Sequence, residues 1–272
     1  MEHLLSQWEL IRSRLKKKNV FLFLDYDGTL TPIAETPDEA VISGEAMDAL
    51  SFVAKCPNCV IAVVSGRSIV DIRALVPIEG LIYAGNHGLE IQGTAIGSYV
   101  FVPEAMHGII QEIKIKLQEA IVSVPGLFVE DKKWSLSCHY RKVSPEDVAL
   151  AKAMFKEVVH SFQEDGKIYV VEGKKVLEVR PSVEWDKGKA VLWLLDKYLF
   201  GNNFDNNKEV IPVYLGDDAT DIDAFKALQD KGITVWVGRE PKFPTGYFLK
   251  DTTEVIEFLQ KLKALLAEKE DA

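Results

Sequence analysis

The feature that most constrains the fold is a series of short runs that are apolar on nearly every residue. They cover residues 20–24, 60–64, 81–84, 210–215 and 233–237, and polar residues or glycine follow each of them. A strand that is apolar on both faces is typical of a parallel sheet covered by helices on both sides. Helical stretches separate these runs, so the sequence predicts an α/β fold with a doubly wound, mainly parallel core.

Three stretches carry helix signals. Ser68 followed by Asp71 predicts a capping box that opens a helix reaching Leu75. Apolar side chains recur at helical spacing over 187–199. Residues 1–18 are predicted to form an amphipathic helix that ends in three lysines. We expect this helix to pack on its own core, with docking on a partner as the alternative.

The middle of the chain has a different pattern. We expect helix, strand and strand, repeated once, over 104–124, 127–130, 135–141, 145–163, 168–171 and 175–179. Apolar and polar residues roughly alternate within 135–141, which is typical of a sheet with one solvent-exposed face. The sequence thus predicts a core of residues 1–103 and 184–272, with a smaller α+β domain, 104–183, inserted into it. The core also contains an Asn-rich loop over 201–208.

Charge and cysteine content narrow the functional class. The 272 residues include 32 Lys+Arg and 41 Asp+Glu, a net charge of −9. Such an acidic surface disfavours nucleic acid or an anionic membrane as the main partner. Three cysteines are too few for a disulfide framework, and no apolar run approaches the roughly 20 residues of a membrane span. Because we find no export signal, we expect a cytoplasmic protein.

Two aspartates, Asp25 and Asp27, directly follow the first apolar run, and Gly28 follows them. With the two-residue period of a strand they can share one side at its carboxyl end, where such sheets bind ligands. One carboxylate can then act as nucleophile or metal ligand while the other carries a proton. An isolated pair of this kind is also compatible with a simple turn after a strand.

Other strand ends carry complementary groups. Ser65, Gly66 and Arg67 follow the second run and precede a helix, which is a natural position for a phosphate contact. The segment 216–221 holds three aspartates after another strand, and carboxylates packed this closely usually hold a hard cation such as Mg²⁺. Lys187 at a helix start can neutralise carboxylate and phosphoryl charge. The alternatives are that Asp218 or Thr220 simply caps the next helix and that Lys187 is a surface lysine.

The order of these groups along the chain resembles that of the haloacid dehalogenase superfamily of phosphohydrolases. Further segments resemble trehalose-6-phosphate phosphatases in particular, and the resemblance runs from about residue 20 to 238. These segments are Gly85-Asn86-His87-Gly88, Glu130-Asp131-Lys132, His139-Tyr140-Arg141, Gly173-Lys174, Glu178-Val179-Arg180-Pro181 and Gly216–Asp221. One departure is Ile222, where many relatives have an acidic residue, and we expect it to have little effect on metal binding.

The resemblance implies a catalytic mechanism. Asp25 would be the nucleophile and form an aspartyl-phosphate, while Asp27 would protonate the leaving sugar oxygen and then deprotonate the attacking water. Ser65 and Lys187 would hold the transferring phosphoryl group. Phosphoryl transfer needs this kind of alignment and charge neutralisation more than elaborate covalent chemistry.

The same resemblance implies a Mg²⁺ site and a substrate site. Asp25 and Asp217 would bind Mg²⁺ through their carboxylates and Asp27 through its backbone carbonyl, with Asp218 and Asp221 in support. The expected substrate-binding residues are Arg67, Asn86, His87, Glu130, Lys132, Arg141 and Glu178. The inserted domain would be a cap that closes over the core and selects the sugar.

We therefore expect a Mg²⁺-dependent phosphatase that hydrolyses trehalose 6-phosphate. The alternatives are the same chemistry on a sucrose, glucosylglycerol or mannosylglycerate phosphate, and a non-catalytic sugar-phosphate binding module. Cys56 and Cys59 form a C-x-x-C pair, but a structural zinc site would need two more ligands. The sequence leaves the oligomeric state open, with a monomer as the simplest expectation.

Overall fold

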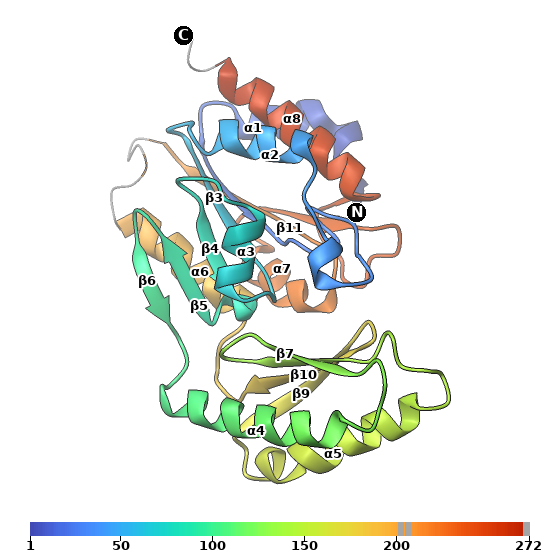
Figure 1. Cartoon of the computed structure of the whole chain (residues 1–272). Helices are drawn as coiled ribbons and strands as arrows, with labels where there is room; N and C mark the ends of the chain where they lie inside the picture. Colours follow the sequence, from blue (N-terminus) through green and yellow to red (C-terminus); the bar gives the residue numbers. More distant parts are fainter. Residues whose placement is uncertain (201–203, 205–207, 269–272) are drawn as a thin grey trace. The chain divides into compact units, whose positions relative to one another are not determined.

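The computed structural model describes residues 1–200, 204 and 208–268. The chain forms two compact units: unit 1 consists of Met1–Val100 and Trp185–Ala272, and unit 2 of Phe101–Glu184 (Figure 1). Most of the Asn-rich loop predicted over 201–208 lies outside the described residues. Among the helices that are described, none is long and apolar enough to cross a membrane.

Unit 1 is built on one sheet. Within the described residues it has nine strands in the order β1-β13-β12-β11-β2-β3-β4-β5-β6. Neighbours from β1 to β4 pair in parallel, and the β4-β5-β6 end is antiparallel. The strands are β1 (Glu2–His3), β2 (Asn19–Leu24), β3 (Cys59–Val64), β4 (Ile82–Gly85), β5 (Glu90–Gly93), β6 (Gly97–Val100), β11 (Val210–Gly216), β12 (Ile233–Val237) and β13 (Tyr247–Leu249).

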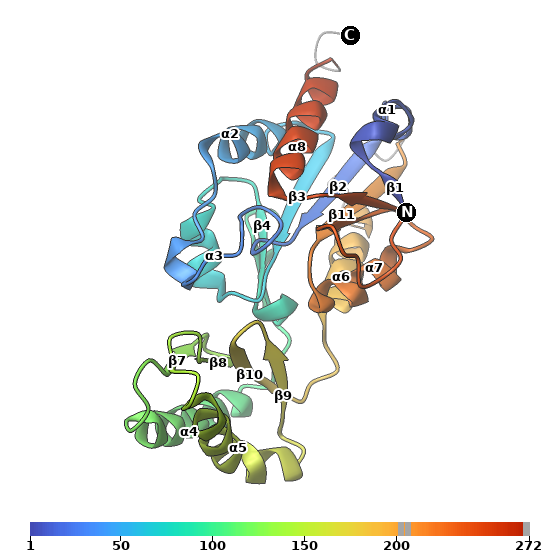
Figure 2. The same ribbon diagram turned by 90° about the vertical axis from the view of Figure 1, so that its right-hand side faces the viewer.

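Helices cover both faces of this sheet (Figure 2). On β2, Val20, Leu22 and Leu24 belong to a core shared with α1 (Trp8–Leu15), α2 (Gly44–Val53), α3 (Ile69–Leu75) and α8 (Thr252–Ala267). Phe21, which alternates with these residues along β2 and faces the other side of the sheet, contacts Tyr198 of α6 (Lys187–Phe200). Helix α6 in turn packs against α7 (Ile222–Leu228). Both faces of β2 are therefore buried, which is why its sequence is apolar throughout. The predicted doubly wound, mainly parallel core is confirmed.

The helix predicted over 1–18 is wrong at its N-terminal end. Glu2–His3 form β1, which pairs with Tyr247 and Phe248 of β13. The backbone N–H of Leu4 donates to Phe248 at 3.0 Å, and the Leu4 side chain is fully buried. A 3₁₀ turn follows, and α1 begins only at Trp8. The edge of β13 offers unpaired backbone groups, and pairing with them outweighs continuation of the helix.

The predicted capping box at the start of α3 forms only in part. The Ser68 hydroxyl accepts the Asp71 backbone N–H at 3.1 Å, as an N-cap should. The same hydroxyl donates to the Asp71 carboxylate at 2.5 Å. The Asp71 carboxylate thus accepts the Ser68 side chain, whereas a capping box uses the Ser68 backbone N–H.

Unit 2 has a four-stranded antiparallel sheet in the order β7-β8-β10-β9 and two long helices that pack against one face of it. The predicted order of helix, strand and strand, repeated once, is observed with boundary shifts of a few residues. In chain order the elements are α4 (Ala105–Ile121), β7 (Phe128–Asp131), β8 (Leu136–His139), α5 (Val148–Glu164), β9 (Ile168–Gly173) and β10 (Val176–Pro181). Its apolar core includes Ile113 and Phe155 from the helices and Leu136 and Val179 from the strands.

Candidate active site

Three neighbouring parallel strands of unit 1 end together and carry the predicted catalytic groups. The strand order β11-β2-β3 places Asp217, Asp25 and Ser65 at one edge of the sheet. The backbone N–H of Asp25 donates to Leu215 at 3.0 Å, and that of Ser65 donates to Ala84 at 2.8 Å. Both groups are therefore fixed by the backbone ladder, at the end of the sheet where doubly wound folds bind ligands.

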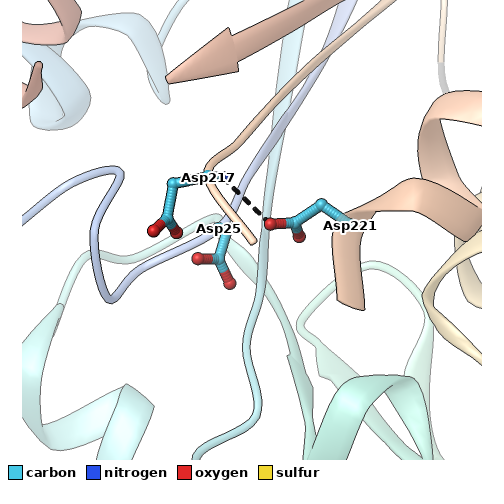
Figure 3. A group of neighbouring side chains, drawn as sticks. All are labelled: Asp25, Asp217 and Asp221. Atoms are coloured by element: carbon cyan, nitrogen blue, oxygen red, sulfur yellow. Dashed lines mark hydrogen bonds between the residues drawn. The ribbon is translucent and has the colours of Figure 1, made fainter. Parts of the chain in front are cut away.

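Three carboxylates converge at this edge (Figure 3). Asp25, Asp217 and Asp221 each place one oxygen within 4.8 Å of the others. The ammonium of Lys187 lies 2.7 Å from Asp25 Oδ1 and 2.7 Å from Asp221 Oδ1, and is almost fully buried. Three negative charges against one positive charge leave an excess of two, which a divalent cation would neutralise.

A glycine makes room for this cluster. Gly28 has a φ of +92°, which favours glycine, and a Cβ at this position would lie 2.2 Å from Asp217 Oδ2. Any larger residue would displace the Asp217 carboxylate from the cluster. The hard oxygen donors and the space kept for them fit a Mg²⁺-type ion.

Asp221 is saturated with hydrogen bonds. Its Oδ1 accepts Lys187 and the Tyr214 hydroxyl, both at 2.7 Å. Its Oδ2 accepts the backbone N–H groups of Asp217 and Asp218, both at 3.0 Å. A carboxylate offers about four lone-pair sites, so these partners occupy them. Asp221 therefore organises the cluster by holding Lys187 and the 217–218 backbone in place.

Burial and neighbouring charges shift the pKa values of Asp25 and Lys187. Burial raises the pKa of Asp25 well above its usual range, and the nearby Asp221 and Asp217 charges raise it further, whereas Lys187 lowers it. For Lys187, burial opposes the ammonium, but the attraction of Asp221 and Asp25 raises its pKa on balance. Lys187 is thus held as a cation, and additional positive charge at the site would favour the ionised form of Asp25.

Asp27 lies beside the cluster with a different partner. Its carboxylate accepts two hydrogen bonds from Arg67, at 2.7 Å from Nε and 2.6 Å from a terminal nitrogen. The Asp27 side chain is 40% exposed, against 8% for Asp25. The two aspartates of the motif therefore occupy different environments, as a division of labour between them requires.

Two loops interlock beside Ser65. The Ser65 carbonyl accepts the His87 backbone N–H at 2.8 Å, and the Arg67 carbonyl accepts that of Asn86 at 2.7 Å. The Asn86 amide is fully buried and donates to Glu90 at 3.0 Å. Asn86 and His87 have φ angles of 50° and 58°, left-handed values that are rare for residues other than glycine. A Cβ at Gly66 would lie 2.5 Å from the His87 ring, so this ring lies directly against the Gly66 backbone.

Asp218 stands at the exposed side of the motif. Its side chain accepts the Ala219 backbone N–H at 2.6 Å and caps the 3₁₀ turn Ala219–Asp221, with Asp221 completing a capping box. The capping alternative considered for 216–221 is therefore realised by Asp218. The same segment still delivers Asp217 to the carboxylate cluster.

In unit 2, two of the predicted sugar-binding residues, Glu130 and Glu178, share one face of the sheet. The register pairs Glu130 with Ser137 and Ser137 with Glu178. The flanking residues Cys138 and Leu177 belong to the apolar core with the helices, so alternation directs the Glu130, Ser137 and Glu178 side chains to the opposite face. In the described part of unit 2, the helices α4 and α5 pack on the other face, with Cys138 and Leu177.

Charged contacts join several of these residues. Lys132 lies 3.3 Å from Glu178, and Arg180 donates to the other oxygen of Glu178 at 2.7 Å. His139 lies 2.7 Å from Glu130. The guanidinium of Arg141 donates to the Lys174 carbonyl, in the turn between β9 and β10, at 2.9 Å.

Sequence reasoning missed Tyr214 altogether. This fully buried tyrosine interrupts an apolar strand and donates to Asp221. A hydroxyl at a position buried on both faces needs a partner, and this requirement was the available signal. The role of Arg67 was also incomplete, since its partner Asp27 is 40 positions away in sequence.

The fold is that of haloacid dehalogenase-like hydrolases. A haloacid dehalogenase-like hydrolase from Bacteroides thetaiotaomicron superimposes with a TM-score of 0.62 at 16% identity, covering 90% of this chain and 100% of that chain. The C-terminal domain of a trehalose-6-phosphate phosphatase from C. albicans superimposes with a TM-score of 0.78 at 23% identity, covering 97% of this chain and 98% of that one. At such identities these likenesses concern the fold.

The chain belongs to the trehalose-phosphatase family, whose profile matches residues 23–245. Trehalose-phosphate phosphatase B of Arabidopsis thaliana is 36% identical over 95% of this chain and 70% of its own length. Probable trehalose-phosphate phosphatase 4 of Oryza sativa subsp. japonica is 40% identical over 95% of this chain and 70% of its own length. The family resemblance read from the sequence motifs is confirmed.

Proposed function

We propose that this protein is a Mg²⁺-dependent phosphatase that hydrolyses trehalose 6-phosphate to trehalose and phosphate. The observation that carries the proposal is Lys187 between two carboxylates, 2.7 Å from Asp25 and 2.7 Å from Asp221, at the edge of the sheet. This arrangement supports a nucleophilic carboxylate beside a fixed positive charge. Membership of the trehalose-phosphatase family supports the choice of substrate.

Asp25 is the proposed nucleophile. A carboxylate oxygen of Asp25 attacks phosphorus, an O–P bond to Asp25 forms, and the bond from phosphorus to the sugar oxygen breaks. Lys187 and Ser65 hold the phosphoryl oxygens during this transfer. The burial of Asp25, Ser65 and Lys187 supports this role, because electrostatic contacts are stronger where water is excluded.

Asp27 is the proposed proton donor and acceptor. It gives a proton to the leaving sugar oxygen in the first step. In the second step it takes a proton from the water that attacks the aspartyl-phosphate, and the Asp25 carboxylate is regenerated. The greater exposure of the Asp27 side chain supports this role, because a proton shuttle must reach both the leaving group and water.

Asp25 and Asp217 are the proposed carboxylate ligands of Mg²⁺, together with the backbone carbonyl of Asp27. The proposed role of Asp218 and Asp221 is support, and the saturated hydrogen bonding of Asp221 favours this over direct coordination. When bound, Mg²⁺ would supply positive charge that neutralises the phosphoryl oxygens. The carboxylate cluster and the space at Gly28 support this site.

The inserted unit 2 is proposed to act as the cap that recognises the sugar. Glu130, Lys132 and Glu178 carry this role in the proposal, and the shared sheet face of Glu130 and Glu178 supports it. Carboxylates and an ammonium together offer many acceptors and donors for the hydroxyls of a disaccharide. The larger set of proposed substrate contacts also contains Asn86, His87 and Arg141. Arg67 belonged to this set in the sequence prediction, and its guanidinium contacts Asp27.

The test is a phosphate-release assay on the purified chain with Mg²⁺ and a panel of sugar phosphates. The proposal expects trehalose 6-phosphate to have the highest kcat/KM in the panel, which includes sucrose, glucosylglycerol and mannosylglycerate phosphates. A higher kcat/KM for another sugar phosphate would support the proposed phosphatase chemistry but would contradict trehalose 6-phosphate as the substrate. Absence of release from every member, with Asp25→Asn as the background control, would favour a non-catalytic binding module.

The proposal also includes a cytoplasmic location and a monomeric state. Cell fractionation tests the first, and light scattering of the purified chain tests the second.

A further inference from the structure

Arg67 forms a bidentate ion pair with Asp27. Its Nε lies 2.7 Å from Asp27 Oδ2 and one terminal nitrogen lies 2.6 Å from Oδ1. Two parallel N–H···O bonds between a guanidinium and a carboxylate fix the angle of the carboxylate as well as its place. Lysine cannot reproduce this geometry, because its ammonium is a point charge on a flexible stem.

Arg67 is itself held from several directions. Its guanidinium lies 5.3 Å from the centre of the Tyr26 ring, and that ring is fully buried with its hydroxyl bonded to Ala40 at 2.7 Å. The Arg67 backbone N–H donates to the Ser65 hydroxyl at 3.1 Å, and its carbonyl accepts the Asn86 N–H at 2.7 Å. These contacts fix the position of Arg67, which links the Ser65 loop to Asp27.

The Asp27 side chain remains partly accessible although Arg67 contacts both of its oxygens. The Arg67 side chain is 10% exposed and the Asp27 side chain 40%. A carboxylate has about four lone-pair sites, of which the Arg67 contact uses two. The other two sites, one on each carboxylate oxygen, are not used by Arg67, and the exposed surface of Asp27 leaves room for a second partner.

We propose that Arg67 is a positioning residue that acts through Asp27: it fixes the orientation of the carboxylate so that a remaining lone-pair site faces the proton-transfer site. This inference rests on the proposed function. In the first step the P–O bond to the sugar breaks as the O–P bond to Asp25 forms, and the proton of the Asp27 carboxyl passes to the sugar oxygen. In the second step water forms the new O–P bond, the Asp25–phosphorus bond breaks, and a water proton returns to Asp27.

This role differs measurably from a direct contact between Arg67 and the substrate. A sugar leaves as a strongly basic oxygen and needs the proton from Asp27, whereas p-nitrophenolate is a stable anion and needs none. If Arg67 acts through Asp27, its loss slows transfer from the sugar phosphate and spares transfer from the aryl phosphate. If Arg67 held the phosphoryl group, both transfers would slow alike.

The experiment measures single-turnover phosphorylation of the full chain by trehalose 6-phosphate and by p-nitrophenyl phosphate, both with Mg²⁺. We expect Arg67→Lys to slow the sugar reaction by about 10²-fold and the aryl reaction by less than about 3-fold, since general acid catalysis contributes about 10²–10⁴-fold. The aryl rate in the same preparation reports folded protein. Arg67→Gln serves as a second variant if Arg67→Lys does not fold.

A matched control and a double-mutant cycle sharpen the result. Arg73 lies 5.8 Å from the Tyr83 ring centre and donates to Gln92 at 2.9 Å, so Arg73→Lys removes an arginine stacked on a tyrosine outside the site. We expect this variant to retain both rates. In an Asp27→Asn background, Arg67→Lys should cause no further loss with the sugar phosphate.

Three outcomes would overturn the inference. Equal slowing on both substrates would assign Arg67 to the phosphoryl group. A change confined to KM for the sugar phosphate would assign it to the sugar. Additive losses of Arg67→Lys and Asp27→Asn would show that the two residues act independently. Failure of the unmodified chain to release phosphate from trehalose 6-phosphate would instead contradict the proposed function.

Discussion

Replacing Asp221 by asparagine tests the role assigned to this buried carboxylate. Asp221 accepts hydrogen bonds from Lys187, Tyr214 and the backbone N–H groups of Asp217 and Asp218. An asparagine side chain has one oxygen acceptor and an NH₂ donor. Whichever way the amide turns, its NH₂ group would face one of the two pairs of donors. The substitution also leaves Lys187, 2% exposed, with one carboxylate fewer.

The expected cost follows from these contacts. Removing one partner of a buried ion pair destabilises a protein by about 3–5 kcal/mol. A chain of this size loses about 2–4 °C of unfolding midpoint per kcal/mol, so the midpoint should fall by about 6–20 °C. We also expect a lower kcat, because Lys187 and the backbone that carries Asp217 lose a common anchor.

Calorimetry of Asp221→Asn beside Asp218→Asn provides the assay. Asp218 belongs to the same motif, but its side chain is 42% exposed, caps a turn and lies 3.9 Å from Lys242. Asparagine is an equally good N-cap, so this control should change stability by less than about 0.5 kcal/mol. A midpoint for Asp221→Asn within about 2 °C of the unmodified chain, below the smallest cost expected for a broken buried pair, would refute the reasoning.

Three further predictions concern the nucleophile, the metal and the cap, and a fourth concerns pH. Asp25→Asn should abolish turnover and leave the fold intact, and more than a few per cent of residual activity by phosphate release would contradict a covalent role. Exhaustive chelation should abolish activity, Mg²⁺ should restore it, and Ca²⁺ should inhibit, because Ca²⁺ accepts looser coordination. Glu130→Gln or Glu178→Gln should reduce kcat/KM for trehalose 6-phosphate by about 10-fold or more and barely affect a small aryl phosphate; equal losses would indicate support of the fold, and no loss a surface ion-pair network. Although burial raises the pKa of Glu254, a backbone N–H and the His3 ring lower it to about 2 from an ordinary 4.5. Because the pKa of Glu254 is lower in the folded state, the ionised carboxylate stabilises the fold at pH values above 4.5, and this stabilisation is lost as the pH falls from 4.5 towards 2. The unfolding midpoint of Glu254→Gln should therefore approach that of the unmodified chain over this pH range.

The sequence alone was sufficient for the main elements of the core and for the edge of the sheet that carries the site. Runs apolar on both faces specify strands covered by helices on both sides, and the carboxyl ends of parallel strands necessarily meet at one edge. Asp25 and Ser65 directly follow such runs, and Asp217 comes one residue later after another, beyond Gly216, so their convergence was predictable before any contact was known. The family motifs added the expected chemistry.

Weaker patterns left other elements out of reach. The strand Glu2–His3 is too short to carry a period, and its pairing depends on Tyr247–Leu249 at the far end of the chain. The hairpin of Glu90–Gly93 and Gly97–Val100 extends the sheet in the antiparallel sense, and four-residue strands are similarly difficult to recognise.

The partners of the site residues were decided only by the tertiary structure. Arg67 meets Asp27 across 40 positions, and Lys187 meets Asp25 across 162. The sequence names these charged groups but cannot say which of them touch, because a hydrogen bond depends on distance and angle and not on residue type alone. Tyr214 shows the same limit, since its strand position was predictable and its hydrogen bond to Asp221 was not. The pattern of apolar residues along the chain determines secondary structure through burial. Which side chains pair depends on how the helices and strands are placed relative to one another, and only tertiary packing decides that.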